Sequence, residues 1–453
     1  MKTDQMIRSL AMRHWTNTES VKREQNLFHF KRRILGQQHQ VKYFHQVDDP
    51  YSLLAAQLLP KLTAAYKIDL EVVIVPSPDK VDAPEQALLR QYANQDCQRI
   101  APYYGLDYTP FYREPCKDLI NLAQTILLQV QSPELMPGYI KTVSNALVQN
   151  HRGTLEQLAK SLSIDLDASR QVETQKQLKQ NHQLRKGLGH YSGAMFFYGS
   201  QWYWGVDRFC YLEKDLIKQD LNRENHLIVN RPTFKHLQNN KPNDVTLEYY
   251  FSLRSPYTYV SMQRVFELAD NLNIKLALRP VLPMMMRGVP ATMAKGKYIF
   301  SDAKREADEV FNVSFGDICD PFGKPVERGY ALFYWALSQK KGRRFALNFC
   351  RAAFSKKADL NKDSALRLVV ENSGLDWTTA QTHLKHREWQ DLLEQNRLTL
   401  YKEMGLWGVP SFRLTLPGQD PINLWGADRL WLIEDQVHRH FITTQENEAI
   451  VEF

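Results

Sequence analysis

Cysteine is scarce in this chain of 453 residues, and its placement excludes several kinds of site. The five cysteines are scattered, and no two of them form a C-x-x-C pair. This spacing argues against a disulfide framework, a zinc knuckle and a dithiol redox centre. The cysteines are Cys97, Cys116, Cys210, Cys319 and Cys350.

Long apolar runs are absent as well. The first twenty residues contain no apolar stretch before a small-residue cleavage site, so we predict no secretory signal. No apolar run is long and charge-free enough to span a bilayer. We therefore expect a cytoplasmic protein without a membrane partner.

Charge and histidine patterns exclude further partners. The net charge of +8 is moderate, and the basic residues are interleaved with acidic ones. No zinc-finger or RNA-recognition motif accompanies them, so we expect small ligands, anionic ones being favoured, and no nucleic acid. His383 and His386 have helical spacing but no third ligand, so they indicate a surface pair and no metal site.

The second half of the chain repeats the first. Identical residues recur in the same order at an offset of 206 residues, and a further set recurs at an offset of 221. A period this long is typical of two copies of one domain, not of a solenoid. The first set is Tyr43, Pro50, Tyr51, Ile68, Leu70, Tyr92, Asp96, Arg99 and Ala101, and the second is Trp204, Gly205, Asp207, Arg208 and Glu213.

Each copy has the same predicted order of elements. A strand leads through an x-Pro-Tyr turn into a helix, and a second strand, a long helical stretch, a hairpin and a last helix follow. The strands are predicted at 41–47 and 70–75, and at 247–253 and 276–281; the helical stretches cover 117–185 and 327–404. We expect a helical arm at 1–40 and domains at 41–240 and 245–453, with a polar joint at 239–244.

The x-Pro-Tyr turn has a simple structural explanation. Ser255 and Asp49 precede the prolines, and both residue types are good helix N-caps before a proline in the first turn. On this interpretation the change from serine to aspartate has no functional meaning.

Longer motifs in the second copy point to a family. FSLRSPYTYV at 251–260, GVP at 408–410 and WGADR at 425–429 follow one another in order. Together they resemble the DsbA-like branch of the thioredoxin superfamily, especially kappa-class glutathione transferases and 2-hydroxychromene-2-carboxylate isomerases. The resemblance covers nearly all of 245–440 and is fainter in the first copy. It implies an α/β fold with two tandem thioredoxin-like domains, each with a helical insertion.

The resemblance also implies the chemistry of the turn. Dithiol relatives have C-P-x-C there, whereas this chain has Ser255 and Thr258 in the two cysteine positions. A helix N-terminus still stabilises a thiolate. The resemblance implies that glutathione brings the thiol as a cosubstrate, and that Ser255 donates a hydrogen bond to its sulfur.

Four other residues would contact glutathione by the same resemblance. Val409 would offer its backbone before the cis-proline Pro410, Asp428 would hold the γ-glutamyl ammonium, and Lys295 would face a carboxylate. A helix cap explains Asp428 equally well, and a lysine such as Lys295 is usually solvated. Further candidates for lining the pocket are Arg254, Tyr257 and Trp407, although core packing also explains Tyr257.

The first copy lacks these features. Asp48 and Asp49 replace Arg254 and Ser255, and Gly193-Ala194 aligns with Val409-Pro410. Two carboxylates would repel a thiolate, so we expect this copy to be released from catalysis. The chain would then be an internal pseudo-dimer, and a further homodimer is left open.

Three functions remain in view. The leading one is a glutathione-dependent isomerase or transferase that acts on a small electrophile of aromatic or enone type. The alternative is a non-catalytic thioredoxin-fold binding or scaffold protein, and a DsbA-type oxidoreductase has the least support. The sequence does not identify the substrate.

Overall fold

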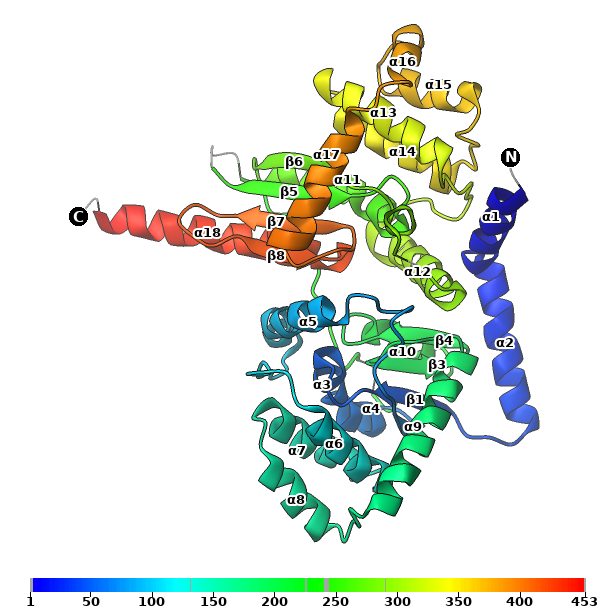
Figure 1. Ribbon diagram of the computed structural model, residues 1–453, viewed down its shortest axis with the longest axis vertical. Coiled ribbons are helices and arrows are strands. Elements are labelled where there is room, and N and C mark those ends of the chain that lie inside the picture. Colours follow the sequence, from blue (N-terminus) through cyan, green and yellow to red (C-terminus); the bar gives the residue numbers. More distant parts are fainter. Residues whose placement is uncertain (1–2, 131, 225, 240–243, 290, 452–453) are drawn as a thin grey trace. The chain divides into compact units, whose positions relative to one another are not determined.

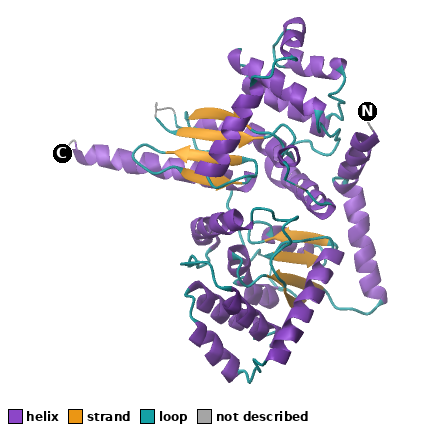
Figure 2. Ribbon diagram, in the orientation of Figure 1, coloured by secondary structure: helices purple, strands orange, loops and turns teal. Residues whose placement is uncertain are grey.

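The chain folds into two compact α/β units. The structure is a computed structural model that describes residues 3–130, 132–224, 226–239, 244–289 and 291–451. The N-terminal unit comprises residues 21–232, and the C-terminal unit comprises residues 1–20 and 233–453. Each unit has a four-stranded sheet with helices packed around it (Figures 1 and 2). The predicted fold class is therefore confirmed.

The two sheets have the same topology. In each, the first two strands are parallel, the third strand pairs antiparallel with the first, and the fourth pairs antiparallel with the third. The N-terminal sheet has the order β2-β1-β3-β4, with β1 (Gln40–His45), β2 (Asp69–Ile74), β3 (Met195–Tyr198) and β4 (Gln201–Trp204). The C-terminal sheet has the order β6-β5-β7-β8, with β5 (Thr246–Phe251), β6 (Lys275–Pro280), β7 (Ser411–Thr415) and β8 (Ile422–Trp425).

Aromatic side chains hold the C-terminal sheet in its core. Tyr249 and Phe251 on β5 are fully buried, and the Tyr249 ring stacks on Phe412 of β7 with centroids 5.3 Å apart. Such residues favour strands because they pack well across a pleated surface. The central strand β5 is thereby fixed, and its end positions the turn that contains Ser255.

The predicted helical stretches are each a series of separate helices. In the N-terminal unit the helices are α3 (Pro50–Ala56), α4 (Leu59–Ala65), α5 (Gln86–Ile100), η1 (Ala101–Tyr104), α6 (Lys117–Gln129), α7 (Met136–Val148), α8 (Arg152–Ser161), α9 (Ala168–Gly187) and α10 (Phe209–Ile217). Helices α6 to α9 occupy the predicted stretch at 117–185.

The C-terminal unit has a corresponding series. Its helices are α11 (Pro256–Asn271), η2 (Met284–Arg287), α12 (Met293–Glu306), η3 (Ala307–Phe311), α13 (Lys324–Ser338), α14 (Gly342–Ser355), α15 (Asp363–Asn372), α16 (Trp377–His383), α17 (Trp389–Leu398), η4 (Thr399–Glu403), η5 (Ala427–Arg429) and α18 (Leu430–Val451). Among the helices that the structure describes, none is long and apolar enough to cross a membrane.

Residues 3–40 form two helices and the start of a strand. Helix α1 (Thr3–Trp15) belongs to the C-terminal unit, whereas α2 (Thr18–Ile34) lies mostly within the N-terminal unit. The predicted arm is therefore shared between the units. The limits 41–240 and 245–453 stay predictions, and residues 240–243 of the predicted joint lie outside the described residues.

Residues that match between the halves make equivalent contacts. The Tyr51 hydroxyl donates to Asp96 Oδ2 at 2.8 Å, and Tyr257 donates to Asp302 Oδ2 at the same distance. Both residues of one pair lie 206 positions before those of the other, so the sequence offset identifies positions that are equivalent in the two units. The origin of the two halves by duplication stays a prediction.

Candidate active site

Ser255 lies between the end of β5 and the start of α11. Its backbone is extended (φ −89°, ψ 124°), and its Oγ accepts a hydrogen bond from the Thr258 amide at 3.2 Å. Pro256 occupies the first helical position, where a missing N–H costs nothing. Asp49 caps α3 in the same way, through the Ser52 amide at 2.9 Å. The predicted capping role is confirmed in both units.

Three separate segments converge beside Ser255. The Ser255 hydroxyl donates to the Val409 carbonyl at 3.3 Å, and the Val409–Pro410 peptide bond is cis, as the resemblance implies. The Pro410 carbonyl in turn accepts from the Gly426 amide at 3.0 Å. The start of α11, the segment just before β7 and the turn before α18 are thus linked by hydrogen bonds.

Asp428 lies in that last turn. A Cβ on Gly426, whose φ is +111°, would be 2.3 Å from Asp428 Oδ1, so only glycine allows the carboxylate to fold back over the turn. Arg429 Nη1 lies 3.6 Å from the same oxygen. Asp428 is therefore held near Pro410 by the Gly426 turn.

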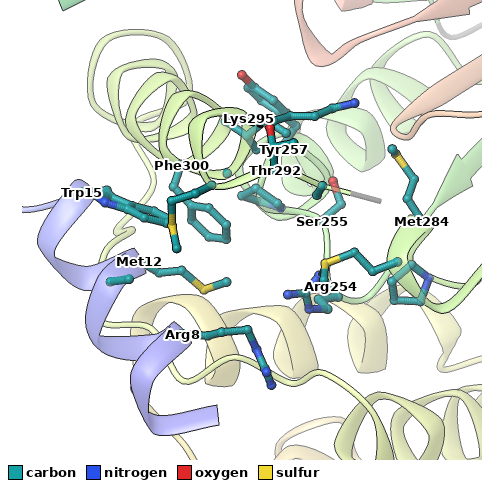
Figure 3. Close-up of a pocket in the computed structure, with 18 of the residues that line it drawn as sticks. Arg8, Met12, Trp15, Arg254, Ser255, Tyr257, Met284, Thr292, Lys295 and Phe300 are labelled. Atoms are coloured by element: carbon teal, nitrogen blue, oxygen red, sulfur yellow. Dashed lines mark hydrogen bonds between the residues drawn. The ribbon is translucent and has the colours of Figure 1, made fainter. Parts of the chain in front are cut away.

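A cavity of about 290 Å³ opens next to Ser255. Of the predicted residues, Ser255, Arg254, Tyr257, Lys295 and Val409 line it, and Figure 3 shows how four of them lie around it. Pro410, Trp407 and Asp428 are not among its described lining residues.

Trp407 contributes to the core instead. Its side chain is buried, and the centroids of the Trp407 and Trp425 rings are 4.7 Å apart. The Trp407 carbonyl accepts a hydrogen bond from Arg287 Nη2 at 2.7 Å. Tyr257 has both of its expected roles. It lines the cavity, and its hydroxyl donates a hydrogen bond to Asp302 within the fold.

The sequence did not identify one wall of the cavity. Helix α1 supplies Ile7, Arg8, Ala11, Met12 and Trp15 to the lining. The spacing of 8, 11, 12 and 15 places these side chains on one helical face. That pattern indicates a covered face but not which part of the chain covers it, because α1 is about 240 residues from β5.

A buried carboxylate joins two arginines at the cavity. Asp320 is 1% exposed, and it accepts from Arg254 Nε at 2.7 Å and from Arg8 Nε at 2.7 Å. Burial acts to raise the pKa of the Asp320 carboxyl, but the two guanidinium groups outweigh it and hold this pKa below its usual value. Asp320 is therefore ionised and orients both arginines.

The corresponding residues of the N-terminal unit make different contacts. The Ser52 hydroxyl donates to Asp49 Oδ2 at 2.7 Å and accepts from the Ala194 amide at 2.7 Å. A Cβ on Gly193 would lie 2.8 Å from the Gln46 side chain and 2.9 Å from Ser52 Oγ. Asp49 Oδ2 thus accepts from both the amide and the hydroxyl of Ser52, and the side chain is engaged in capping α3.

Ala194 occupies the position of Pro410. Its carbonyl accepts from the Gly205 amide at 2.8 Å, as the Pro410 carbonyl does from Gly426. Unlike proline, Ala194 has an amide to donate to Ser52. Burial raises the pKa of Asp49 to about 6, against the opposing effect of its hydrogen bonds from Ser52.

Among the described residues, thiols and metal ligands do not gather at the cavity. All five cysteines are free, only Cys116 is exposed, and burial raises the pKa of the Cys350 thiol. The described lining residues include no cysteine. Within the described part of the chain, no group of three or more histidine, cysteine, aspartate or glutamate residues could hold a metal ion.

Comparisons with known proteins identify the C-terminal domain. The sequence model of the DSBA-like thioredoxin domain matches residues 246–438. Among solved structures, 2-hydroxychromene-2-carboxylate isomerase is 19% identical with a TM-score of 0.37, over 45% of this chain and 98% of that protein. The cytosolic disulfide reductase DsbM from Pseudomonas aeruginosa, in a structure with GSH, is 15% identical with a TM-score of 0.31, over 45% and 99%. No curated protein matches the chain significantly. Residues 246–438 are therefore a DsbA-like thioredoxin domain, with Ser255 at the start of its first helix.

Proposed function

We propose that the C-terminal unit binds glutathione and uses its thiolate to isomerise or conjugate a small electrophile. The observation that carries this proposal is the position of Ser255. Its hydroxyl lies at the N-terminus of α11, beside the backbone of Val409 and at the edge of an apolar cavity. A thiol, a helix terminus and an electrophile could meet at this point.

The helix start would activate the thiol. Helix α11 has 16 residues, and the positive end of its dipole lies at Ser255, where it favours a thiolate over a thiol. The bond from the Ser255 hydroxyl to the Val409 carbonyl, at 3.3 Å, is long for an O–H···O hydrogen bond. Ser255 can therefore give it up at little cost and donate to a sulfur anion instead.

The rest of the tripeptide would bind along the converging segments. The Val409 backbone would pair with the cysteinyl residue next to the bend at Pro410. Asp428 would hold the γ-glutamyl ammonium, and Lys295 would hold a carboxylate. The hydrogen bond between Gly426 and Pro410 supports this arrangement because it ties the Asp428 turn to the Val409 segment.

The cavity favours an enzyme over a scaffold protein. Small-molecule sites are typically apolar clefts of about 300–1,000 Å³ with a few polar groups, and this cavity, at about 290 Å³, is just below that range. Its lining supports a small electrophile beside the sulfur. A dithiol mechanism lacks support, because the described lining contains no cysteine. We propose that this activity is cytoplasmic, because thiols stay reduced in that compartment.

Calorimetry with glutathione tests the proposal. We expect Asp428→Ala to weaken binding at least tenfold, because a charged pair to the ligand ammonium is lost. Asp207→Ala, the matched change in the N-terminal unit, should leave the affinity unchanged. Absence of binding to the unaltered protein, or equal affinities for the Asp428 and Asp207 variants, would favour the non-catalytic alternative.

A further inference from the structure

We propose that helix α1 forms the second wall of the electrophile site and selects flat apolar molecules that carry one carboxylate, held by Arg8 together with Arg254. The inference depends on the proposed function in one respect, namely that the bound molecule is the electrophile. The binding itself requires no glutathione. Helix α1 lies outside the matched DsbA-like domain at 246–438, so this wall is not part of the region that the family model covers.

Several hydrogen bonds fasten α1 to the C-terminal unit. Gln5 Nε2 donates to the Asp320 carbonyl at 2.9 Å, and Ser9 Oγ accepts from the Asp320 amide at 2.9 Å. On the other side, the Trp15 carbonyl accepts from Ser301 Oγ at 3.2 Å. Because α1 is bonded on two sides, its inner face is a fixed part of the cavity.

The wall between these bonds suits a flat ring system. Met12 is 6% exposed, and Trp15 packs against Phe300 with ring centroids 6.4 Å apart (Figure 3). Methionine side chains are polarizable and adapt to ring edges and faces. Four methionines line the cavity: Met12, Met284, Met285 and Met293.

The two arginines leave one positive charge unbalanced. Both guanidinium groups share the single carboxylate of Asp320, and each lies 4.9 Å from the centroid of the Phe322 ring. In this mostly apolar cavity, an anionic ligand group would offset that charge, and the low local dielectric strengthens the attraction.

The arginines also have hydrogen-bond donors to spare. Arg8 uses only Nε in its bond to Asp320, and among the described residues its terminal nitrogens donate to no acceptor. Arg254 Nη1 contacts only the weak acceptor Met285 Sδ, at 3.5 Å, among the residues that the structure describes. Guanidinium groups with free donors match the planar geometry of a carboxylate. Arg8 and Arg254 both line the cavity, so a carboxylate there can reach them.

Calorimetry with a matched pair of probes tests this site. The probes are 2-naphthoate and its neutral isostere 2-naphthamide, titrated into the full chain without glutathione. We expect the protein to bind naphthoate at least tenfold more tightly. Arg8→Gln should reduce naphthoate affinity about tenfold and leave naphthamide unchanged, because only the anion loses a partner.

Three further variants separate a specific effect from a loss of structure. Arg13→Gln is the control on the same helix, because Arg13 donates to the Ile318 carbonyl and does not line the cavity; it should change neither affinity. Met12→Ala should weaken both probes equally, and Arg8→Lys should restore part of the preference for naphthoate.

Two outcomes would overturn the inference. One is equal affinity of the unaltered protein for the two probes, or no binding of either. The other is an Arg8→Gln variant that weakens both probes to the same extent while circular dichroism stays unchanged. Failure of glutathione to bind, with the naphthoate preference intact, would reject the proposed function and leave this inference standing.

Discussion

At the scale of single residues, Ser255 and Asp49 show how surroundings decide the use of one position. Both side chains cap a helix that follows a central strand. Asp49 is enclosed by Ser52 and the Gly193-Ala194 segment, whereas Ser255 lies at the edge of an apolar cavity. Capping accounts for the residue type in both units, and only the cavity distinguishes a candidate site from a structural turn.

Asp49→Ser should therefore not create a second glutathione site. The substituted serine could still cap α3, but the Gln46 and Ser52 side chains lie so close to Gly193 that even a Cβ there would clash with them. Calorimetry of the variant should give the same stoichiometry as the unaltered protein. A second binding event would mean that the charge of Asp49, and not the packing around it, prevents glutathione from binding to the N-terminal unit.

At the scale of elements, local patterns predicted the sheets well. The four parallel-paired strands lie within one or two residues of their expected limits, because alternating and β-branched runs depend on nearby sequence. For the helical stretches, the sequence predicted the outer limits but not the division into separate helices, because the turns between those helices are short.

The contacts of α1 could not be predicted in this way. Its partners are Asp320 and Ser301, about 300 positions further along the chain, and no local pattern encodes such a pairing. The ion pair between Arg254 and Asp320 was missed for the same reason, with 66 residues between its partners. Motifs located Ser255, Val409 and Lys295 because the resemblance supplied the long-range information.

Histidines in and beside the N-terminal sheet should make its unit sensitive to acid. Burial lowers the pKa of His45 to about 3, burial and the nearby Arg185 lower that of His190 to about 3, and burial with Arg32 and His29 lowers that of His39 to about 4. These groups stay neutral in the fold, whereas the unfolded chain protonates them below about pH 6.5. The stabilisation that comes from keeping these histidines neutral is therefore complete above about pH 6.5, and it decreases as the pH drops toward 4.

Asp49 opposes this trend, since its raised pKa of about 6 makes the fold less stable as the pH rises from about 4 to 6. Burial raises the pKa of Glu213 as well, and it lowers the pKa of two further histidines in this unit, His29 and His182. The histidines with a lowered pKa outnumber the carboxyls with a raised pKa, so we expect a net loss of stability in acid. Hydrogen exchange in the full chain should show faster amide exchange in β1 and β3 at pH 5 than at pH 7, after correction for intrinsic rates. His45→Phe should lessen the difference, because His45 Nδ1 is buried and has no partner among the described residues. Equal protection at both pH values would contradict the assignment.

At the scale of the whole molecule, the two units share one sheet topology but differ around the first helix of each. Both units keep the tyrosine-to-aspartate bond that anchors the first helix, Tyr51 to Asp96 and Tyr257 to Asp302. Within the described residues, only the C-terminal unit combines an open turn with the added wall of α1. We therefore propose the C-terminal unit as the place of the chemistry.

The most direct test of this assignment is the pKa of the glutathione thiol when it is bound to the protein. Thiolate absorbance, followed against pH with glutathione and saturating protein, gives this value. We expect it to lie below the ordinary thiol value of about 8.5, and Ser255→Ala should raise it by about 1–2 units, since a hydrogen bond to a charged group contributes about 1.5–3 kcal/mol. Asp376→Ala is the matched control, because it removes the N-cap of α16 without touching the cavity. A bound thiol that titrates as in free glutathione, or that ignores Ser255→Ala, would contradict the central claim.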